Sequence, residues 1–178
     1  MNSNFKNENL KKTVITAMFA AMAAVLTAFV QIKTPTGGYI HLGDCAVYLA
    51  ACFLPLPYAM AAGAIGGGLA DLLVYPETIL YTVIIKALNA SVFSSKGDKI
   101  ATKRNLAMAF VSGLITVVGY SISKYIRVML AGGTSAAALA DAIRKIPENS
   151  IQAAASAAIF IIAALAFDKL DLKKKLLK

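Results

Sequence analysis

One short polar stretch contains side chains that can donate, accept or exchange a proton. In residues 37–44, GGYIHLGD, the only histidine of the chain stands between a tyrosine and an aspartate. The paired glycines permit a tight, mobile turn. A lone histidine in a loop can be merely solvated, a tyrosine can anchor at a membrane interface, and an aspartate can cap the helix that follows. The combination makes Tyr39, His41 and Asp44 candidates for a lid over a ligand.

A second polar group lies inside an apolar segment. Lys86 stands near the middle of that segment, where a lysine costs roughly 2.5–3.5 kcal/mol in a bilayer and should face the protein interior or a wet cavity. Thr82 and Asn89 share its helix face by their spacing. Asp71, in the preceding apolar segment, is its natural partner. The two can form a structural ion pair, and they can also line a substrate pocket.

Two later segments carry polar faces at helical spacing: Tyr120, Lys124 and Arg127 in one, and Asn149, Gln152 and Ser156 in the other. The basic pair on the first face can also extend toward the membrane interface without contacting a ligand. If these faces converge with that of Lys86, they form an apolar cleft with a few placed polar groups, which is typical of small-molecule sites. The predicted substrate-binding residues are Tyr39, His41, Asp44, Tyr75, Lys86, Asn89, Tyr120, Asn149 and Gln152.

The elements that must hold these residues are long apolar blocks. The chain has 178 residues, 58% of them hydrophobic, and a mean hydropathy of +0.68, whereas soluble domains are about 45–50% apolar. Crossing a bilayer takes about 20 apolar residues in a helix. The sequence therefore predicts an all-α integral membrane protein with one membrane domain over residues 1–178. Its six expected spans are 13–31, 43–54, 58–75, 78–93, 106–130 and 150–167, with longer connectors at 33–42 and 132–148.

The net charge of +9 is concentrated at both termini and in one loop. Twelve of the 18 Lys and Arg lie at the N-terminus, in the loop 94–105 or at the C-terminus. Under the positive-inside rule these segments are cytoplasmic, and six crossings place them on one side. The stretch 37–44, the turn at Pro76 and the connector 132–148 then face the exterior. Nucleic-acid binding is disfavoured, because it needs one contiguous basic face.

Motifs for catalysis and phosphate binding are absent from the sequence. There is no GxxxxGK[ST], HExxH or GxSxG, and Cys45 and Cys52 lack metal-ligand spacing. We therefore expect no enzyme activity, no metal and no cofactor, but a binding subunit that takes its energy from partners. The alternative is a stand-alone secondary transporter of a small metabolite, which needs protonatable groups in several spans and usually an inverted repeat. Only Asp71 is a buried acid, and no clear repeat is present.

Small residues line one face of the first apolar segment. Ala17, Ala21 and Ala24 recur at helical spacing, and such faces let helices approach closely in lipid. Gly63 and Gly67 form a GxxxG pair in the third segment, where internal packing is the simpler interpretation. The long alanine face favours a surface for a partner protein.

These residues together resemble a known family. The stretch GGYIHLGDCAVYLAACFLPLPYAMAAGAIGGGLADLL, followed by ETILYTVIIKALNA, resembles the substrate-binding S components of energy-coupling factor (ECF) vitamin transporters. It is most similar to the branch assigned to riboflavin-type, hydroxymethylpyrimidine and pyridoxine-type substrates. HLGD, LADLL and IIK in that order carry the resemblance, which covers essentially the whole chain. One departure is the short turn Tyr75-Pro76-Glu77, where a longer loop rich in glycine and aromatic residues is expected.

The resemblance implies a six-helix subunit that captures a vitamin at the bacterial cell membrane, with both termini in the cytoplasm. Such subunits dock through the first helix onto a transmembrane coupling subunit that two ATPases drive. Carried onto this chain, Ala17, Ala21 and Ala24 become the docking surface and residues 37–44 the lid. The ligand we expect is a small, flat, polar heterocycle of pyridoxine or hydroxymethylpyrimidine type.

Overall fold

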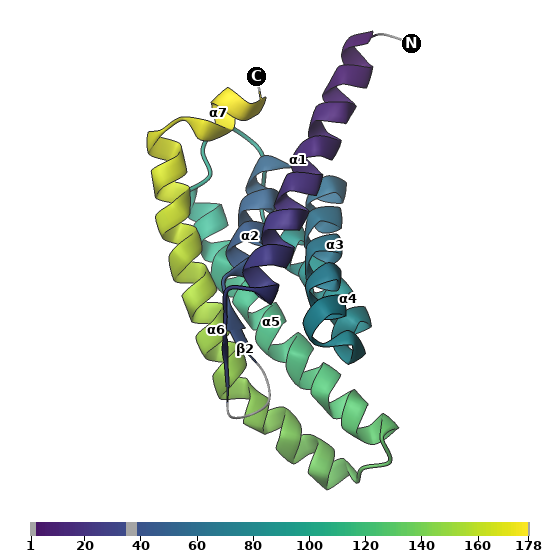
Figure 1. Ribbon diagram of the computed structural model, residues 1–178. Coiled ribbons are helices and arrows are strands. Elements are labelled where there is room, and N and C mark those ends of the chain that lie inside the picture. The colour runs from purple at the N-terminus through teal and green to yellow at the C-terminus, as the bar shows by residue number, and fades with distance from the viewer. Residues whose placement is uncertain (1–2, 35–38, 178) are drawn as a thin grey trace.

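A computed structural model describes residues 3–34 and 39–177, with side chains from residue 7 onward. Within these residues the chain forms a helical bundle with one small β-hairpin (Figure 1). In chain order the elements are α1 (Ser3–Ala28), β1 (Gln31–Lys33), β2 (Tyr39–His41), α2 (Gly43–Phe53), α3 (Leu56–Val74), the 3₁₀ helix η1 (Pro76–Thr78), α4 (Ile79–Ser91), α5 (Lys103–Leu130), α6 (Ser135–Lys169) and α7 (Leu172–Leu177).

Four of the described helices are long and apolar enough to cross a membrane: α1 from residue 7, α3, α5 and α6. Their outward surfaces carry exposed apolar side chains such as Phe110 and Ile162, which are 66% and 69% exposed and suit contact with lipid. Helices α2 and α4 have 11 and 13 residues, or about 16 and 20 Å at 1.5 Å per residue. Since the apolar core of a bilayer is about 30 Å thick, the count of six crossings stays a prediction.

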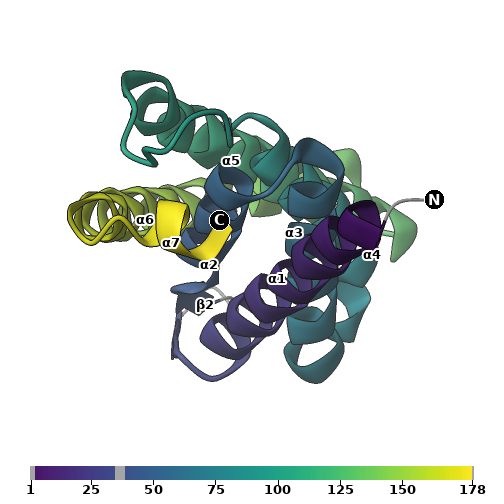
Figure 2. The same ribbon diagram turned by 90° about the horizontal axis from the view of Figure 1, so that it is seen from above.

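Helix α2 is the centre of the bundle. Every residue of α2 is buried, because α1, α3, α4 and α6 all pack around it, as the view down the bundle shows (Figure 2). Tyr48 stacks on Phe93 at 5.0 Å between ring centroids, and Phe160 meets Tyr48 edge-on at 5.8 Å. This aromatic cluster joins α2 to the end of α4 and to α6.

Glycines let the helices around α2 approach closely. A Cβ at Gly43 would collide with the Thr27 side chain of α1, and one at Gly63 would lie 2.7 Å from the carbonyl oxygen of Lys86 in α4. The Gly63–Gly67 pair therefore packs inside the protein, against the part of α4 that carries Lys86. This packing fixes the depth of that lysine relative to α3.

The first predicted connector contains a β-hairpin. Strands β1 and β2 are antiparallel, with Gln31 opposite His41 and Lys33 opposite Tyr39. The first helix consequently ends at Ala28 instead of residue 31. Gly37 and Gly38, the proposed hinge, lie outside the described residues. The hairpin was missed because three-residue strands show too little alternation to be recognised from sequence.

The second predicted connector, 132–148, is mostly helical, which corrects that prediction. Helix α6 begins at Ser135 and continues through Pro147 to Lys169. The Thr134 hydroxyl oxygen accepts a hydrogen bond from the Ala137 N–H at 3.3 Å, and the alanine-rich segment that follows favours a helix. The last predicted span is therefore the second half of one 35-residue helix.

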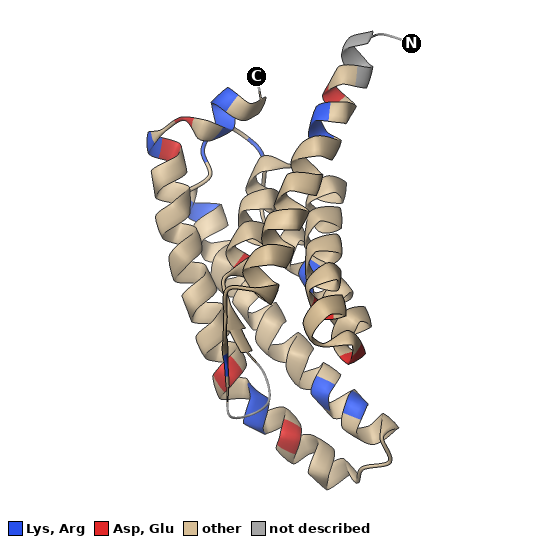
Figure 3. Cartoon of the chain, in the orientation of Figure 1, with Lys and Arg blue, Asp and Glu red and all other residues tan. Residues whose placement is uncertain are grey.

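The end of the bundle near α7 is closed by buried polar side chains. Asn105 accepts from the Ser94 N–H at 2.9 Å and donates to the carbonyls of Ser94 and Ile100. The Asp168 carboxylate accepts from the N–H groups of Ile100 and Ala101, at 2.8 and 2.9 Å. Lys and Arg gather at this end and again at the outer ends of α5 and α6, with few in between (Figure 3).

Candidate functional site

A cavity of about 150 Å³ lies at the end of the bundle away from α7. It is enclosed by β2, the end of α3, η1, α5 and α6. Helices α5 and α6 extend past the other helices at this end (Figure 1), whereas the central α2 begins only at Gly43. The difference in helix length leaves the space that the cavity occupies.

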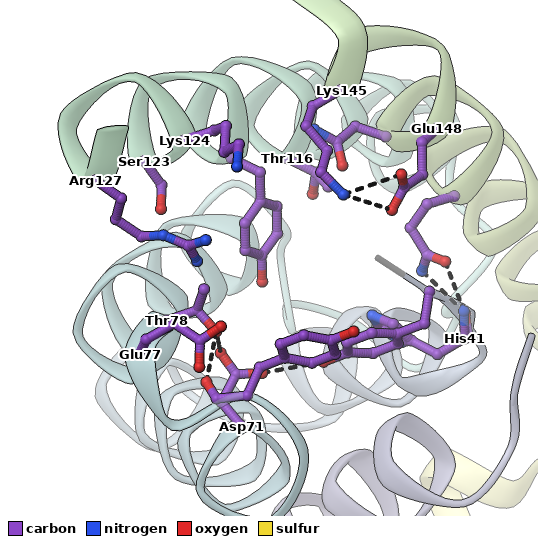
Figure 4. Close-up of a pocket in the computed structure, with 15 residues that line it drawn as sticks. His41, Asp71, Glu77, Thr78, Thr116, Ser123, Lys124, Arg127, Lys145 and Glu148 are labelled. Atoms are coloured by element: carbon purple, nitrogen blue, oxygen red, sulfur yellow. Dashed lines mark hydrogen bonds and ion pairs between the residues drawn. The ribbon is translucent and has the colours of Figure 1, made fainter. Parts of the chain in front are cut away.

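Asp71 lies on one side of the cavity (Figure 4) and is joined there by two stacked tyrosines. The rings of Tyr39 and Tyr75 stack at 5.3 Å with an interplanar angle of 13°. The Tyr39 hydroxyl donates to Asp71 Oδ1 at 3.0 Å, and the Thr78 hydroxyl donates to Asp71 Oδ2 at 2.6 Å. Burial and the adjacent Asp71 charge raise the pKa of Tyr39 far above its usual value of 10. Tyr39 therefore remains a neutral donor that orients the aromatic wall.

Gln152 on α6 fixes the position of the hairpin strand β2. Its Oε1 accepts from the His41 N–H at 2.7 Å, and its Nε2 donates to the His41 carbonyl oxygen at 2.9 Å. The same amide nitrogen reaches Asp44 Oδ2 at 3.2 Å and Ser156 Oγ at 3.0 Å. One side chain thus pairs with the backbone of β2 as a neighbouring strand would, and connects it to α2.

The His41 ring is held in its neutral form. Its Nδ1 accepts a hydrogen bond from the Gly43 N–H at 3.1 Å and lies 3.4 Å from the Thr27 hydroxyl. An acceptor at Nδ1 places the proton of the neutral ring on Nε2. Burial lowers the pKa of His41 to about 4, with Lys86 acting in the same direction and Asp44 against it. At neutral pH the ring can donate one hydrogen bond from Nε2.

An ion pair between Asp44 and Lys86 lies beneath the cavity. Both side chains are almost completely buried, and Lys86 Nζ lies 5.4 Å from the centre of the Tyr120 ring. The expected pairing of Lys86 with Asp71 is wrong, because Asp71 binds the hydroxyls of Tyr39 and Thr78 instead. Asp44 and Asp71 both lie at a depth along their helices that Lys86 can reach. The rotation of α2 and α3 about their axes decides which of the two acids faces the lysine.

Helix α5 contributes a continuous polar face to the cavity. Its lining residues are Thr116, Tyr120, Ser123, Lys124 and Arg127. Lys124 pairs with Asp141 of α6 at 3.3 Å, and the Tyr120 hydroxyl lies 3.1 Å from that of Thr82. Lys124 and Arg127 thus line the cavity as well as lying near the end of α5. Their spacing with Tyr120 was the signal in the sequence.

Helix α6 forms the opposite wall, partly from the segment that was predicted to be a connector. Lys145 pairs with Glu148 at 3.1 Å, and Asn149 and Gln152 follow on the same face. Lys145 and Glu148 were missed because residues 132–148 were predicted to form a connector. The spacing 145, 148, 149 and 152 is helical and could have revealed them. Asn149 Nδ2 is buried and has no hydrogen-bond partner among the described residues.

The structure separates the predicted residues into two groups. The group that lines the cavity is Tyr39, His41, Tyr75, Tyr120, Asn149 and Gln152. Asp44, Lys86 and Asn89 do not line it and are fully or almost fully buried. Asn89 donates to Thr116 Oγ1 at 2.8 Å, and Asp44 accepts from Gln152 Nε2 at 3.2 Å. Asn89 and Asp44 therefore position Thr116 and Gln152, which line the cavity.

The alanine face of α1 has an exposed and a buried side. Ala17 and Ala21 are exposed and Ala24 is partly exposed. Ala20 and Ala23 are buried, and a Cβ at Gly66 of α3 would lie 2.8 Å from the Ala23 Cβ. The surface that was predicted to dock a partner is therefore free in this chain.

Two comparisons with known proteins agree with this architecture. A family model described as "ECF-type riboflavin transporter, S component" matches residues 7–169. An uncharacterised protein of Pyrococcus woesei, described as lying in a gap 3′ region, is 31% identical over 105 residues. That alignment covers 57% of this chain and 70% of the relative.

Proposed function

The chain belongs to the S-component family of ECF-type riboflavin transporters, and from that premise we propose that its cavity binds a single-ring polar heterocycle. Members of this family are substrate-binding membrane subunits for vitamin uptake and are not enzymes. The substrate that we propose is a vitamin or precursor of pyridoxine or hydroxymethylpyrimidine type.

The size and lining of the cavity support this choice. Its volume is about 150 Å³, similar to an engineered protein cavity of about 150 Å³ that binds benzene. Tyr39, Tyr75 and Tyr120 offer ring faces, and Asn149 and the His41 ring offer hydrogen-bond donors. Flat rings with nitrogen and hydroxyl acceptors suit this combination.

We further propose that the cavity faces the exterior. The basic side chains of the first turns of α1, the segment before α5, and α7 lie at the opposite end (Figure 3). Under the positive-inside rule that end is cytoplasmic. Substrate then enters between the hairpin and the ends of α3 and α5. In this orientation Asp44, Lys86 and Asn89 position the lining residues from below.

The family implies a transmembrane coupling subunit and ATPase subunits as partners. We propose that Ala17, Ala21 and Ala24 form the docking surface, since small exposed residues allow a second helix to approach closely in lipid. Uptake into proteoliposomes tests the function. We expect substrate accumulation only with the coupling and ATPase subunits and ATP. Accumulation by this chain alone, driven by an ion gradient, would instead favour the secondary transporter.

The docking surface can be tested in the same system. Replacing the exposed Ala21 by phenylalanine should abolish ATP-driven uptake while the free energy of unfolding changes by less than about 0.5 kcal/mol, as is usual at surfaces. Substrate binding to the purified variant should persist. Leu114→Phe, at a 65% exposed position of α5, is the matched control and should transport normally. Normal uptake by the Ala21→Phe variant would contradict docking at this face.

A further inference from the structure

Arg127 is a positive charge in the cavity wall that forms no ion pair with an acid of the described residues. It lies in the last turn of α5, is half-buried, and extends into the cavity beside Thr78 and Glu77 (Figure 4). The other two cations of the wall have partners, Lys124 with Asp141 and Lys145 with Glu148. Among the described side chains Arg127 makes no ion pair within 4.0 Å.

Neither Asp71 nor Glu77 forms an ion pair with Arg127. Both oxygens of Asp71 accept from hydroxyls, those of Tyr39 and Thr78. Glu77 is exposed at the rim, where water screens its charge. A basic residue in the last turn of a helix can simply complement the helix dipole or extend into the interface. Neither the interaction with the helix dipole nor the extension into the interface requires the side chain to line the cavity, as that of Arg127 does.

Asn149 provides a second, independent donor without a partner. Its side chain is only 9% exposed, and its Nδ2 has no hydrogen-bond acceptor among the described residues. An unpaired buried amide costs free energy unless a ligand or ordered water completes it. Arg127 and Asn149 therefore both present donors without an acceptor among the described side chains, and a guest that carries acceptors would match them.

We propose that the substrate carries an anionic oxygen group, a carboxylate or a phosphate, that binds Arg127, while an acceptor on its ring binds Asn149. This inference rests on the proposed function and narrows its substrate class. A guanidinium presents parallel N–H donors that match two oxygens of one carboxylate or phosphate. The anion would have few competing water molecules in a half-buried site, so the contact discriminates between charged and neutral forms of the same ring.

Three probes with one ring each test this subsite: benzoate, phenyl phosphate and the neutral benzamide. The full chain in detergent is titrated with each probe at constant ionic strength, set with chloride, and the thermal midpoint is followed by tyrosine fluorescence. A ligand that binds the folded state raises the midpoint by mass action. We expect at least one anion to bind about tenfold more tightly than benzamide, as a charge-assisted hydrogen bond provides. The anionic probe that binds more tightly, benzoate or phenyl phosphate, shows whether the subsite prefers a carboxylate or a phosphate.

Variants of two arginines on α5, Arg127 and Arg104, test whether the preference for an anionic probe depends on Arg127. Arg127→Gln should remove the preference for the anion, and Arg127→Lys should retain part of it, because the charge remains without the paired donors. Arg104→Gln changes the charge equally at an exposed position near the start of α5 and should bind as the unaltered chain does. The proposal is overturned if no anion protects better than benzamide, or if Arg127→Gln keeps the preference. If either of these results is found and a neutral vitamin binds tightly, the proposed function stands, and only the inference that the substrate carries an anionic group is rejected.

Discussion

At the end near α7, Asn105, Asp168 and Lys173 direct their polar atoms to backbone groups of the loop before α5. At the cavity end, Arg127 and Asn149 are left with donors that nothing in the described chain accepts. Both ends bury polar side chains in an apolar protein. Burial of polar groups therefore does not identify a binding site by itself, whereas unused hydrogen-bonding capacity that faces a cavity supports the proposal of one.

The buried ion pair Asp44–Lys86 lies between the two ends of the bundle. Substitution there should cause the largest loss of stability, because it removes one of two paired charges. Replacing Lys86 by methionine leaves the Asp44 carboxylate buried without its partner, and we expect a loss of about 3–5 kcal/mol in the free energy of unfolding. Titration with dodecyl sulfate measures this loss. The double variant Asp44→Leu/Lys86→Met removes both charges and should recover most of it. Equal losses in the single and double variants would show that the pair does not support the cavity floor.

The next comparison uses one structural side chain from each end. Gln152→Leu removes the partners of the His41 N–H and carbonyl, and Asp168→Ala removes the partner of two N–H groups of the loop. Gln152→Leu should destabilise the fold by about 2–4 kcal/mol, since it leaves two buried groups unpaired, and Asp168→Ala by less, since its two N–H partners are only partly buried. Only Gln152→Leu should also weaken substrate binding, measured by titration calorimetry at a temperature where both variants are folded. A matching loss of affinity in Asp168→Ala would remove the distinction between the two ends.

A smaller effect is expected from pH. The folded-state pKa of His41 is lowered to about 4 by burial, below the usual value of about 6.5. The unfolded chain therefore binds more protons between these values, so the stability that depends on the neutral ring is complete above pH 6.5 and is lost as pH falls toward 4. We expect a loss of about 2 kcal/mol between pH 6.5 and 5.

The groups that face the His41 ring define the control for this experiment. Asp44, Lys86, Tyr39, Thr27 and the Gly43 N–H surround it, and among them only a change at the carboxylate could also contribute near pH 5. His41→Asn keeps an acceptor for the Gly43 N–H and removes the titrating ring, so its stability should vary less over this range. An unchanged slope in that variant would assign the pH dependence to another group.

Local sequence patterns predicted most of the helical elements and six of the fifteen residues that line the cavity. The spacing of Tyr120 with Arg127, and of Asn149 with Gln152, located the two walls, because side chains three, four or seven residues apart share a helix face. The same patterns did not reveal that Asp44, instead of Asp71, meets Lys86. That choice depends on how α2 and α3 are rotated against α4, which Gly63 and its contact with the Lys86 backbone help to set.

Two other features were missed, the first for lack of a local signal and the second although the sequence carried one. The hairpin is held through Gln152, more than 100 residues away from His41 in the chain, so its short strands had no local signal. Pro147 lies inside α6, although proline usually ends a helix. The cap at Thr134 and the alanines after it favour a helix before Pro147, and they outweigh the tendency of that proline to end one. Lys145 and Glu148 were missed because they fall in the segment 132–148, which was predicted to be a connector.

The most direct test is calorimetric titration of the purified chain with a panel of water-soluble vitamins and their precursors, followed by the same titration of two variants. The account predicts that a single-ring member of the panel binds one to one, with a dissociation constant below micromolar. Asn149→Ala should weaken this binding about tenfold, as the loss of one buried hydrogen bond implies, while Asp168→Ala leaves it unchanged. If no member binds below micromolar, or if both variants bind equally well, the cavity at the outer ends of α5 and α6 is not the substrate site.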